Sequence, residues 1–244
     1  MNDFSDRLTR AERDRSHDNV RPRDASTLII IDRSGGVPKV LLGKRHHGHK
    51  FMPGKFVFPG GRMETNDRLM PVAAGLNPAA EHLLMKEMQR PSAAKARALA
   101  LAAIRETFEE TGLLFGARLS DAPKSPTGPW SEFAATGFYP DLSALHFIAR
   151  AVTPTRRPKR FDTRFFAVDA SAIAHRVEGV VHGDAELVEL VWMPLNEART
   201  LDMPTITGVV LEELQARVSA GFGHDLPVPY YRMPRTRFLR KLIS

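Results

Sequence analysis

The segment from residue 93 to residue 111 constrains the fold most strongly. It is rich in alanine, leucine and charged residues, begins directly after Pro91-Ser92 and ends at Gly112. Ser92 can serve as an N-cap that accepts a hydrogen bond from the first turn, and glycine is favoured just past a helix end. A shorter stretch of helical composition precedes it over residues 79 to 90. The sequence therefore predicts two consecutive helices near the middle of the chain.

Short runs of β-favouring residues lie on both sides of these helices. Turns such as Gly35-Gly36 and Pro59-Gly60-Gly61 connect the early runs. The expected strands cover residues 26–32, 39–45, 55–58, 144–152, 161–168 and 187–193, and further helices are expected over 194–201 and 206–220. Because strands and helices alternate without an internal repeat, we expect a mixed α/β domain whose sheet is covered by helices.

Composition excludes several classes of protein. The chain has 244 residues, of which 43% are hydrophobic and 26% charged, as in soluble globular proteins. The longest apolar run, Ala98 to Ile104, is far shorter than the roughly 18 residues needed to cross a bilayer. The N-terminus lacks the apolar stretch of a signal peptide, so we expect a cytoplasmic protein with no membrane partner. With no cysteine, disulfides, thiolate nucleophiles and zinc–thiolate sites are excluded.

The net charge of +7 is concentrated in two segments. Residues 153–164 contain five basic residues and one acid, and residues 229–244 contain five basic residues and no acid. This distribution indicates a localised anionic partner such as a phosphate-bearing ligand, and it equally fits a solvated loop and tail. Residues 1–25 have few apolar positions, so we expect a flexible charged arm, a domain over 26–228 and a basic tail over 229–244.

Three carboxylates lie at the C-terminal end of the long helix. Glu106 and Glu110 are four residues apart and Glu109 is three residues from Glu106, so all three share one sector. Each like-charge pair costs about 0.2–0.5 kcal/mol, and the helix dipole adds to this cost. Arg105 can offset part of it by pairing with Glu109. A solvated acidic helix end is one explanation, and a bound Mg²⁺ or Mn²⁺ is the other, because hard cations take oxygen ligands.

The residues from Arg105 to Leu113, taken with Gly61, resemble the signature of the Nudix hydrolase family. That signature is a Gly, five residues, a Glu, seven residues, and then Arg-Glu-apolar-any-Glu-Glu-any-Gly-apolar. The five fixed identities of its second half are present, whereas in the first half Asp67 stands where the family usually has Glu. Between Asp67 and Arg105 lie 37 residues rather than seven. An insertion over about 68–92 therefore loops out here. Asp67 could for this reason have lost the structural role of the glutamate that the family usually has at this position.

The resemblance implies a Nudix-type α/β/α sandwich with a mixed sheet, and a Mg²⁺- or Mn²⁺-dependent hydrolase that adds water to a diphosphate. The metal ligands would be Glu106, Glu109 and Glu110, with the Gly61 carbonyl as a further ligand. Arg105 would orient Glu109.

The same resemblance implies roles for other residues. Gly60 and Gly112 would be structural, and Glu106 and Glu110 would take part in catalysis. Glu186 lies six residues before Trp192, where the family often has another acid, and would be an extra ligand or the base. Glu189 is its competitor, although its place in an alternating strand favours a solvated face.

Three further stretches resemble the coenzyme A diphosphatase branch of the family. They are LLGKR at 41–45, PGKFVFPGG at 53–61 and RFDTRFF at 160–166, the last similar to the long-insertion subgroup of that branch. The resemblance implies that coenzyme A or an acyl-CoA is cleaved to phosphopantetheine and 3′,5′-ADP. Arg45, Arg160 and Arg164 would contact phosphates through their planar guanidinium groups. For Arg160 and Arg164, a structural role through Asp162 is the alternative.

Two other functions fit the sequence. The same chemistry could act on ADP-ribose, NADH or a capped RNA end, or the chain could be a non-catalytic module that binds a nucleotide or RNA. Basic residues interleaved with Tyr230, Tyr231 and Phe238 would suit RNA through stacking and phosphate contacts. The complete set of three glutamates favours an enzyme. The basic tail could also contact a second subunit and form a homodimer.

Overall fold

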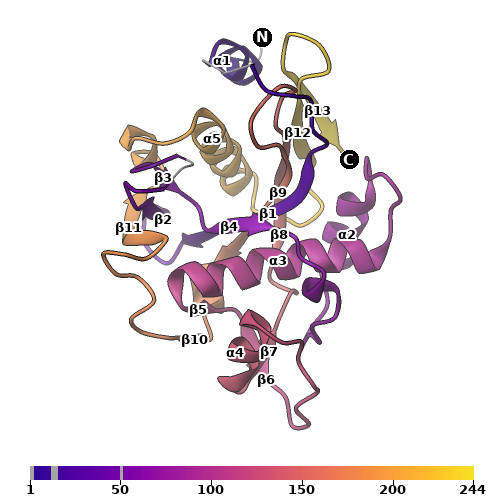
Figure 1. The fold of residues 1–244 in the computed structure, drawn as a ribbon, viewed down its shortest axis with the longest axis vertical. Coiled ribbons are helices and arrows are strands. Elements are labelled where there is room, and N and C mark those ends of the chain that lie inside the picture. The colour runs from indigo at the N-terminus through magenta and orange to yellow at the C-terminus, as the bar shows by residue number, and fades with distance from the viewer. Residues whose placement is uncertain (1–2, 12–15, 50–51) are drawn as a thin grey trace.

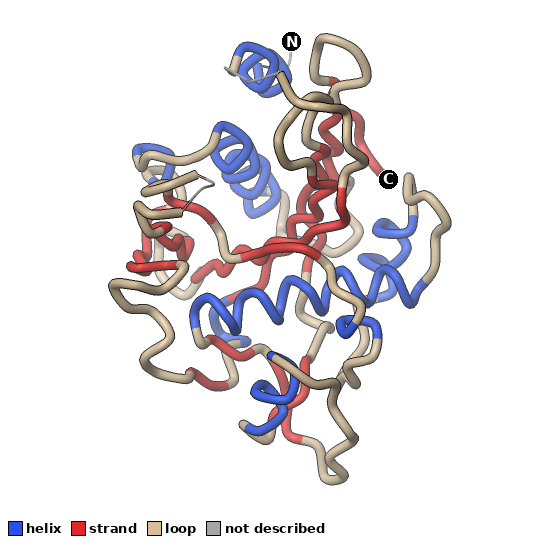
Figure 2. The backbone as a smooth tube through the Cα atoms, in the orientation of Figure 1, coloured by secondary structure: helices blue, strands red, loops and turns tan. Residues whose placement is uncertain are grey.

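The computed structural model describes residues 3–11, 16–49 and 52–244. A large mixed sheet runs through the middle of the molecule, with helices on both of its faces (Figures 1 and 2). The strands of this sheet are β1 (Arg23–Asp32), β2 (Lys39–Arg45), β3 (Phe56–Val57), β4 (Gly60–Arg62), β8 (His146–Val152), β9 (Phe161–Asp169), β11 (Leu187–Pro194), β12 (Val228–Arg232) and β13 (Leu239–Ile243). This architecture is the helix-covered α/β sheet predicted from the sequence.

Helices and two small strand pairs surround the sheet. The helices are α1 (Asp3–Arg10), α2 (Pro78–Met85), α3 (Ala93–Thr111), α4 (Pro129–Ala135) and α5 (Thr205–Ser219), and the 3₁₀ turns are η1 (Asn66–Arg68), η2 (Ala170–Ala172) and η3 (Ala198–Thr200). One small pair joins β5 (Leu113–Leu114) to β10 (His175–Arg176), and the other joins β6 (Gly116–Arg118) to β7 (Phe138–Pro140). In the parts of the chain that the structure describes, no helix has the length and apolar character needed to cross a membrane.

The order of the main strands is β11-β2-β1-β9-β8-β12-β13. The central strands β1 and β9 are parallel, whereas β2 and β4 both pair antiparallel with β1, at its second and first half respectively. Strand β1 is buried on both faces, because Leu28 and Ile30 contact one hydrophobic cluster and Ile29 and Ile31 the other. This arrangement brings the Gly60-Gly61 turn directly beside the central strand.

Helix α3 has the boundaries predicted from its capping residues. The Ser92 hydroxyl accepts a hydrogen bond from the Lys95 amide at 3.2 Å, and Gly112 takes a left-handed conformation with φ of 72°. The helix packs against β1, and its fully buried Ala96, Ala100 and Ala103 lie in the same hydrophobic cluster as Leu28 and Ile30 of that strand. The close packing places the C-terminal glutamates of α3 next to β4.

The insertion over about 68–92 does not loop out of the fold as expected. Its apolar side chains enter the core beside α3, with Met70 fully buried and Leu83 and Leu84 almost so. The helix expected over 79–90 is α2, which ends at Met85 because Lys86 is extended. The insertion thus extends the hydrophobic core on the α3 face. Similarly, in place of a helix over 194–201, Pro194 ends β11 and only the turn η3 follows.

The two ends of the chain were expected to be a flexible arm and a basic tail, and both contain regular structure. Residues 228–232 and 239–243 form β12 and β13 at one end of the main sheet, because Tyr231, Phe238 and Ile243 bury their side chains between basic residues. Helix α1 contacts the same region, where the Phe238 amide donates to the Thr9 hydroxyl at 2.9 Å. Strand β1 begins at Arg23, three residues early. Residues 1–2 and 12–15 of the expected arm lie outside the described residues.

Candidate active site

The glycine turn of β4 lies against the C-terminal half of α3. The Gly60 amide donates a hydrogen bond to Glu110 Oε2 at 3.3 Å. A Cβ atom added to Gly61 would overlap the Glu106 carboxyl group, which would have to move away from its present position. Glycine at position 61 is therefore what allows the backbone to approach the carboxylates so closely.

Of the glutamates at this turn, Glu110 is buried and Glu106 is partly buried, and their charges repel one another. Burial raises the pKa of Glu106 to about 7; Arg105 opposes this rise, and the charges of Glu109 and Glu186 add to it. Burial also raises the pKa of Glu110 well above its ordinary value, and Glu186 and Glu106 add to the effect. The negative charges of these carboxylates are therefore only partly balanced by nearby arginines. A bound cation would relieve the remaining repulsion.

Arg105 holds the turn and the helix together. Its Nη1 donates to Glu106 Oε1 at 2.9 Å and to Glu109 Oε1 at 2.7 Å. Its Nε donates to Asp67 Oδ1 at 2.8 Å, and its Nη2 to the Arg62 carbonyl at 2.8 Å. Burial opposes its charge, but the bonds to Asp67 and the charge of Glu106 raise its pKa overall. The Arg105 guanidinium thus bonds both Glu109 and the Arg62 carbonyl that follows the glycine turn.

Asp67 has a structural role despite the insertion. It is fully buried and accepts hydrogen bonds from Arg105, from Trp130 Nε1 at 3.0 Å and from the Glu64 amide at 2.7 Å. The insertion does not displace it, because Asp67 lies in η1, before the inserted residues move away. Sequence reasoning missed Trp130, since nothing in the spacing links it to Asp67.

Arg45 and Glu186 join the site from the other side. Pairing of β2 with β11 brings them together, and Arg45 Nη2 lies 2.9 Å from Glu186 Oε1. Both act electrostatically on Glu110, whose pKa Glu186 raises and Arg45 lowers. Glu189, by contrast, is exposed and lies 3.9 Å from Lys44 Nζ. The geometry therefore places Glu186 rather than Glu189 among the glutamates.

Arg160 and Arg164 have other partners. Arg164 is almost completely buried and bonds Asp24 Oδ1 at 2.8 Å and the Asp162 carbonyl at 2.7 Å. Arg160 donates to the Thr153 carbonyl at 3.2 Å and to Asn19 Oδ1 at 2.9 Å. A buried guanidinium needs such partners to offset its desolvation. In contrast to the expected phosphate contact, Arg164 therefore stabilises the sheet through Asp162 and Asp24.

The donor set of the site fits a hard divalent cation. Among the described residues, no three histidine, aspartate or glutamate side chains already form a closed metal-binding group. However, Arg105 takes only one oxygen each of Glu106 and Glu109, and Gly60 one oxygen of Glu110, so each carboxylate keeps a second oxygen. Carboxylate oxygens beside an unobstructed glycine backbone suit Mg²⁺ or Mn²⁺.

Comparison with known proteins finds solved structures of similar fold. No family model matches the chain. It is similar to the solved NUDIX hydrolase from Alicyclobacillus acidocaldarius, with 29% identity over 81% of this chain and 92% of that chain and a TM-score of 0.58. It is also similar to RenU, a Nudix hydrolase from M. smegmatis, with 15% identity over 81% and 87% of the two chains and a TM-score of 0.43. It is similar as well to the NUDIX domain of Shewanella oneidensis NrtR complexed with ADP ribose, with 12% identity over 82% of this chain and 90% of that chain and a TM-score of 0.44.

The fold and the arrangement of the glutamates agree with the similarity to the Alicyclobacillus NUDIX hydrolase. A mixed sheet between helices carries a glycine turn against three glutamates of one helix, and Arg105 fixes both. The chain therefore combines this geometry with a fold similar to that of the Alicyclobacillus NUDIX hydrolase.

Proposed function

We propose that the chain hydrolyses the diphosphate bond of a nucleoside diphosphate linked to another group, with Mg²⁺ or Mn²⁺ as cofactor. The favoured substrate is coenzyme A or an acyl-CoA, and the products are phosphopantetheine, or its acyl derivative, and 3′,5′-ADP. The observation that carries this proposal is the contact of Glu106 and Glu110 with the Gly60-Gly61 turn, with pKa values that burial and the charge of Glu186 raise.

Each residue of the site has a distinct task in this proposal. Glu106, Glu109 and Glu110 hold the cation, and the bare backbone of Gly61 leaves room for it. The bound cation would neutralise phosphate oxygens and lower the pKa of a water molecule. Glu186 has a half-exposed side chain, and its charge raises the pKa of Glu106 and Glu110. We infer that it accepts a proton from that water.

The overall reaction adds one water molecule and breaks one phosphoanhydride bond. The oxygen of water forms a bond to one phosphorus, the bridging oxygen leaves with the other phosphorus, and the proton passes to solvent through the base. Both products are phosphomonoesters. Arg45 lies beside Glu186 with a largely buried side chain, where its guanidinium is placed to contact a phosphate oxygen of the substrate.

The choice of coenzyme A rests on the sequence stretches at 41–45, 53–61 and 160–166. Strand β2 carries the first of them and ends at Arg45, and the second contains the glycine turn itself. Both stretches therefore border the proposed site. ADP-ribose, NADH and a capped RNA end contain the same kind of bond, so the experiment must include them.

A hydrolysis panel tests the proposal. Coenzyme A, acetyl-CoA, ADP-ribose, NADH and a capped RNA are incubated with the protein and Mg²⁺, and the products are resolved by mass. We expect 3′,5′-ADP from the coenzyme A compounds, none with Glu110→Gln, and normal yields with Glu132→Gln, which changes an exposed glutamate of α4. Release of products from ADP-ribose alone would overturn the proposal that coenzyme A is the substrate. The absence of product from every compound would overturn the proposal that the protein is a hydrolase.

A further inference from the structure

A hollow with an entirely basic charge lies beside the glycine turn. Its charged lining consists of Arg21, Arg23, Arg62, Lys159 and Arg160. The hollow has a volume of about 630 Å³, and the described residues that line it include no aspartate or glutamate. We refer to these five side chains and the space between them as the basic hollow.

The fold, rather than one run of sequence, assembles the basic hollow. Arg23 begins β1, where it pairs with Phe161 of β9 and its amide bonds the Arg160 carbonyl at 2.9 Å. Arg62 ends β4, where it pairs with Ala25 of β1. Hydrogen bonds of the sheet therefore fix the backbones that carry Arg23, Arg62 and Arg160.

Two of the five cations keep their donors available. Arg160 is held by Thr153 and Asn19, and Arg21 Nη2 donates to Gln89 at 3.1 Å. Arg23 and Arg62 are exposed, and their guanidinium groups make no hydrogen bond or ion pair with any residue that the structure describes.

A neighbouring hollow provides the contrast. It also contains Arg150 and Arg164, but there Asp162 pairs with both of them. Arg150 and Arg164 are therefore balanced within the fold, whereas Arg23 and Arg62, which line both hollows, have no such partner among the described residues. No aspartate or glutamate lines the basic hollow, so its positive charge is available to attract an anionic ligand.

The basic hollow adjoins the catalytic turn. Arg62 directly follows Gly61, so their Cα atoms are about 3.8 Å apart, and a side chain at Gly61 would strike Glu106. The Arg62 carbonyl accepts a hydrogen bond from Arg105, which also donates to Glu109. Successive side chains of a strand point to opposite faces, so Arg62 leaves β4 on the face away from Glu106. A ligand with one phosphate at the glutamates and another on its ribose would reach the hollow around the edge of β4.

We propose that the basic hollow binds a phosphomonoester group of the substrate, separate from the diphosphate that is cleaved. Arg23 and Arg62 supply the two free guanidinium forks, whose planar geometry matches the oxygens of a phosphate. This proposal rests on the proposed function, because it assigns the hollow to the 3′-phosphate of a coenzyme A compound. It makes Arg23 and Arg62 residues that determine specificity without acting on the reacting bond.

The kinetic test compares coenzyme A with dephospho-coenzyme A, which lacks only the 3′-phosphate. We expect the wild type to prefer coenzyme A by roughly tenfold or more in kcat/KM, since charge-assisted hydrogen bonds contribute about 1.5–3 kcal/mol. In the double variant Arg23→Gln/Arg62→Gln the preference disappears through a higher KM for coenzyme A. Arg235→Gln, which changes an exposed arginine outside the hollow, leaves turnover of both coenzymes unchanged.

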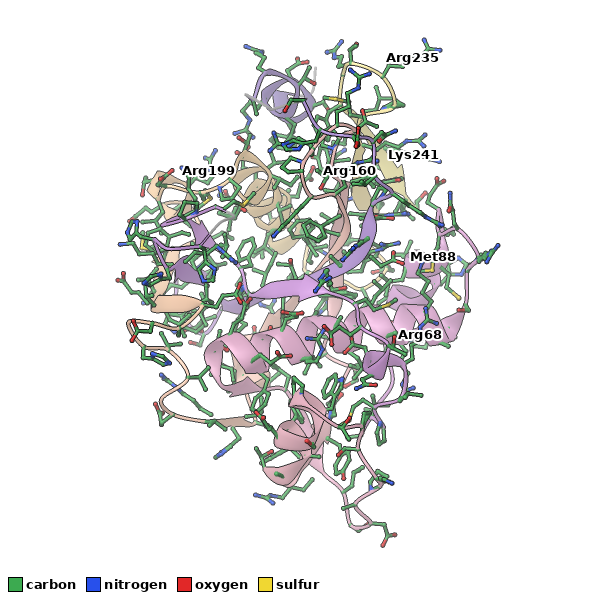
Figure 3. The ribbon with its side chains drawn as sticks, in the orientation of Figure 1. Arg68, Met88, Arg160, Arg199, Arg235 and Lys241 are labelled. Atoms are coloured by element: carbon green, nitrogen blue, oxygen red, sulfur yellow. The ribbon has the colours of Figure 1, made fainter. Side chains whose placement is uncertain are left out.

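A binding test is independent of catalysis. Calorimetry without metal compares 3′,5′-ADP with 5′-AMP, which again differ by the 3′-phosphate. We expect 3′,5′-ADP to bind the wild type at least about tenfold more tightly and the double variant equally weakly. Arg235→Gln is the matched control, because Arg235 is exposed on the loop after β12, outside the hollow (Figure 3).

The possible outcomes separate the two proposals. Equal affinity of the wild type for 3′,5′-ADP and 5′-AMP, with hydrolysis of both coenzymes at one rate, overturns the hollow and leaves the proposed function intact. A preference for 3′,5′-ADP without hydrolysis of any coenzyme A compound supports the hollow and overturns the proposed substrate. Equal nucleotide affinities, with RNA binding that the double variant loses, would assign the hollow to RNA instead.

Discussion

Arg105 donates from Nε and Nη2 to both carboxylate oxygens of Asp67, at 2.8 and 3.2 Å, although 38 positions separate the two residues in the chain. The insertion begins directly after Asp67 and ends before α3, the helix that carries Arg105, so this ion pair spans the insertion. The same guanidinium reaches Glu106 and Glu109. A single buried contact therefore links the packing of the insertion to the geometry of the proposed active site.

Replacing Asp67 with asparagine should destabilise the protein by about 3 kcal/mol, because it leaves a buried guanidinium without its main partner. The free energy of unfolding from urea titration measures the loss. Asp121→Asn is the matched control, since Asp121 is exposed in the loop after β6. If both variants unfold at the same urea concentration as the wild type, the ion pair contributes nothing to stability.

Replacing Glu110 with glutamine should abolish turnover and raise the stability of the metal-free protein by roughly 1 kcal/mol at pH 8. The folded-state pKa of Glu110 is raised by burial and by Glu186 and Glu106. The unfolded glutamate therefore ionises first, and stability falls as pH rises from about 4.5 toward the folded-state pKa. The gain from glutamine is present above that window and absent below it.

Thermal unfolding with and without Mg²⁺ measures this effect. Mg²⁺ should raise the melting temperature of the wild type and have less effect on Glu110→Gln, because one ligand is missing. A variant that is less stable than the wild type at pH 8 without metal would contradict the repulsion among the carboxylates.

Alanine at Gly61 should lower activity about a hundredfold or more and cost roughly 1–3 kcal/mol of stability, because its methyl group would overlap the Glu106 carboxyl group. Gly36→Ala is the control, since no atom lies within 4 Å of a Cβ atom there. Steady-state kinetics and urea unfolding of both variants provide the measurement. Normal activity of Gly61→Ala would show that the backbone need not approach the glutamate.

Stability should also fall in mild acid because of His146. Its ring stacks on His224 at 3.7 Å, and its buried Nδ1 has no hydrogen-bond partner among the described residues. Burial, together with the charges of His224, Arg217 and Arg33, lowers its pKa to about 3. The unfolded histidine takes up a proton near pH 6.5 and the folded one does not, so stability is full above pH 6.5 and declines as pH falls toward 3.

The decline should be at most about 1.4 kcal/mol per pH unit. Urea unfolding between pH 7.5 and 4 should show a shallower decline for His146→Leu than for the wild type. His182→Leu, which changes an exposed histidine, should retain the full decline. Parallel curves for all three proteins would assign the acid sensitivity to other groups.

Local signals were sufficient to predict α3 and its acidic end. Ser92 and Gly112 cap the helix as their side chains and backbone freedom dictate. The i, i+3 and i, i+4 spacing placed the glutamates together, since helical periodicity needs no knowledge of the rest of the chain. The strands of residues 39–45, 161–168 and 187–193 were similarly readable from their apolar and β-branched content.

Long-range contacts were not readable from the sequence. The partners of Asp67 include Trp130, and those of Arg164 include Asp24; both contacts depend on how distant segments pack. The C-terminal residues seemed too basic for a sheet, because the burial of Tyr231 and Ile243 depends on partners far away in the chain. The basic hollow was hidden for the same reason, since its cations come from three separate segments.

The parallel pairing of β1 with β9 has a consequence for folding kinetics. Contacts such as that of Asp24 with Arg164 join residues 140 positions apart, so the centre of the sheet closes only after a very long loop has been ordered. Chains dominated by such non-local contacts fold slowly. During synthesis, β1 emerges long before its central partner and must remain soluble until that partner arrives. The rate-limiting step of folding should therefore be the meeting of these two strands, with the early strand exposed to aggregation in the meantime.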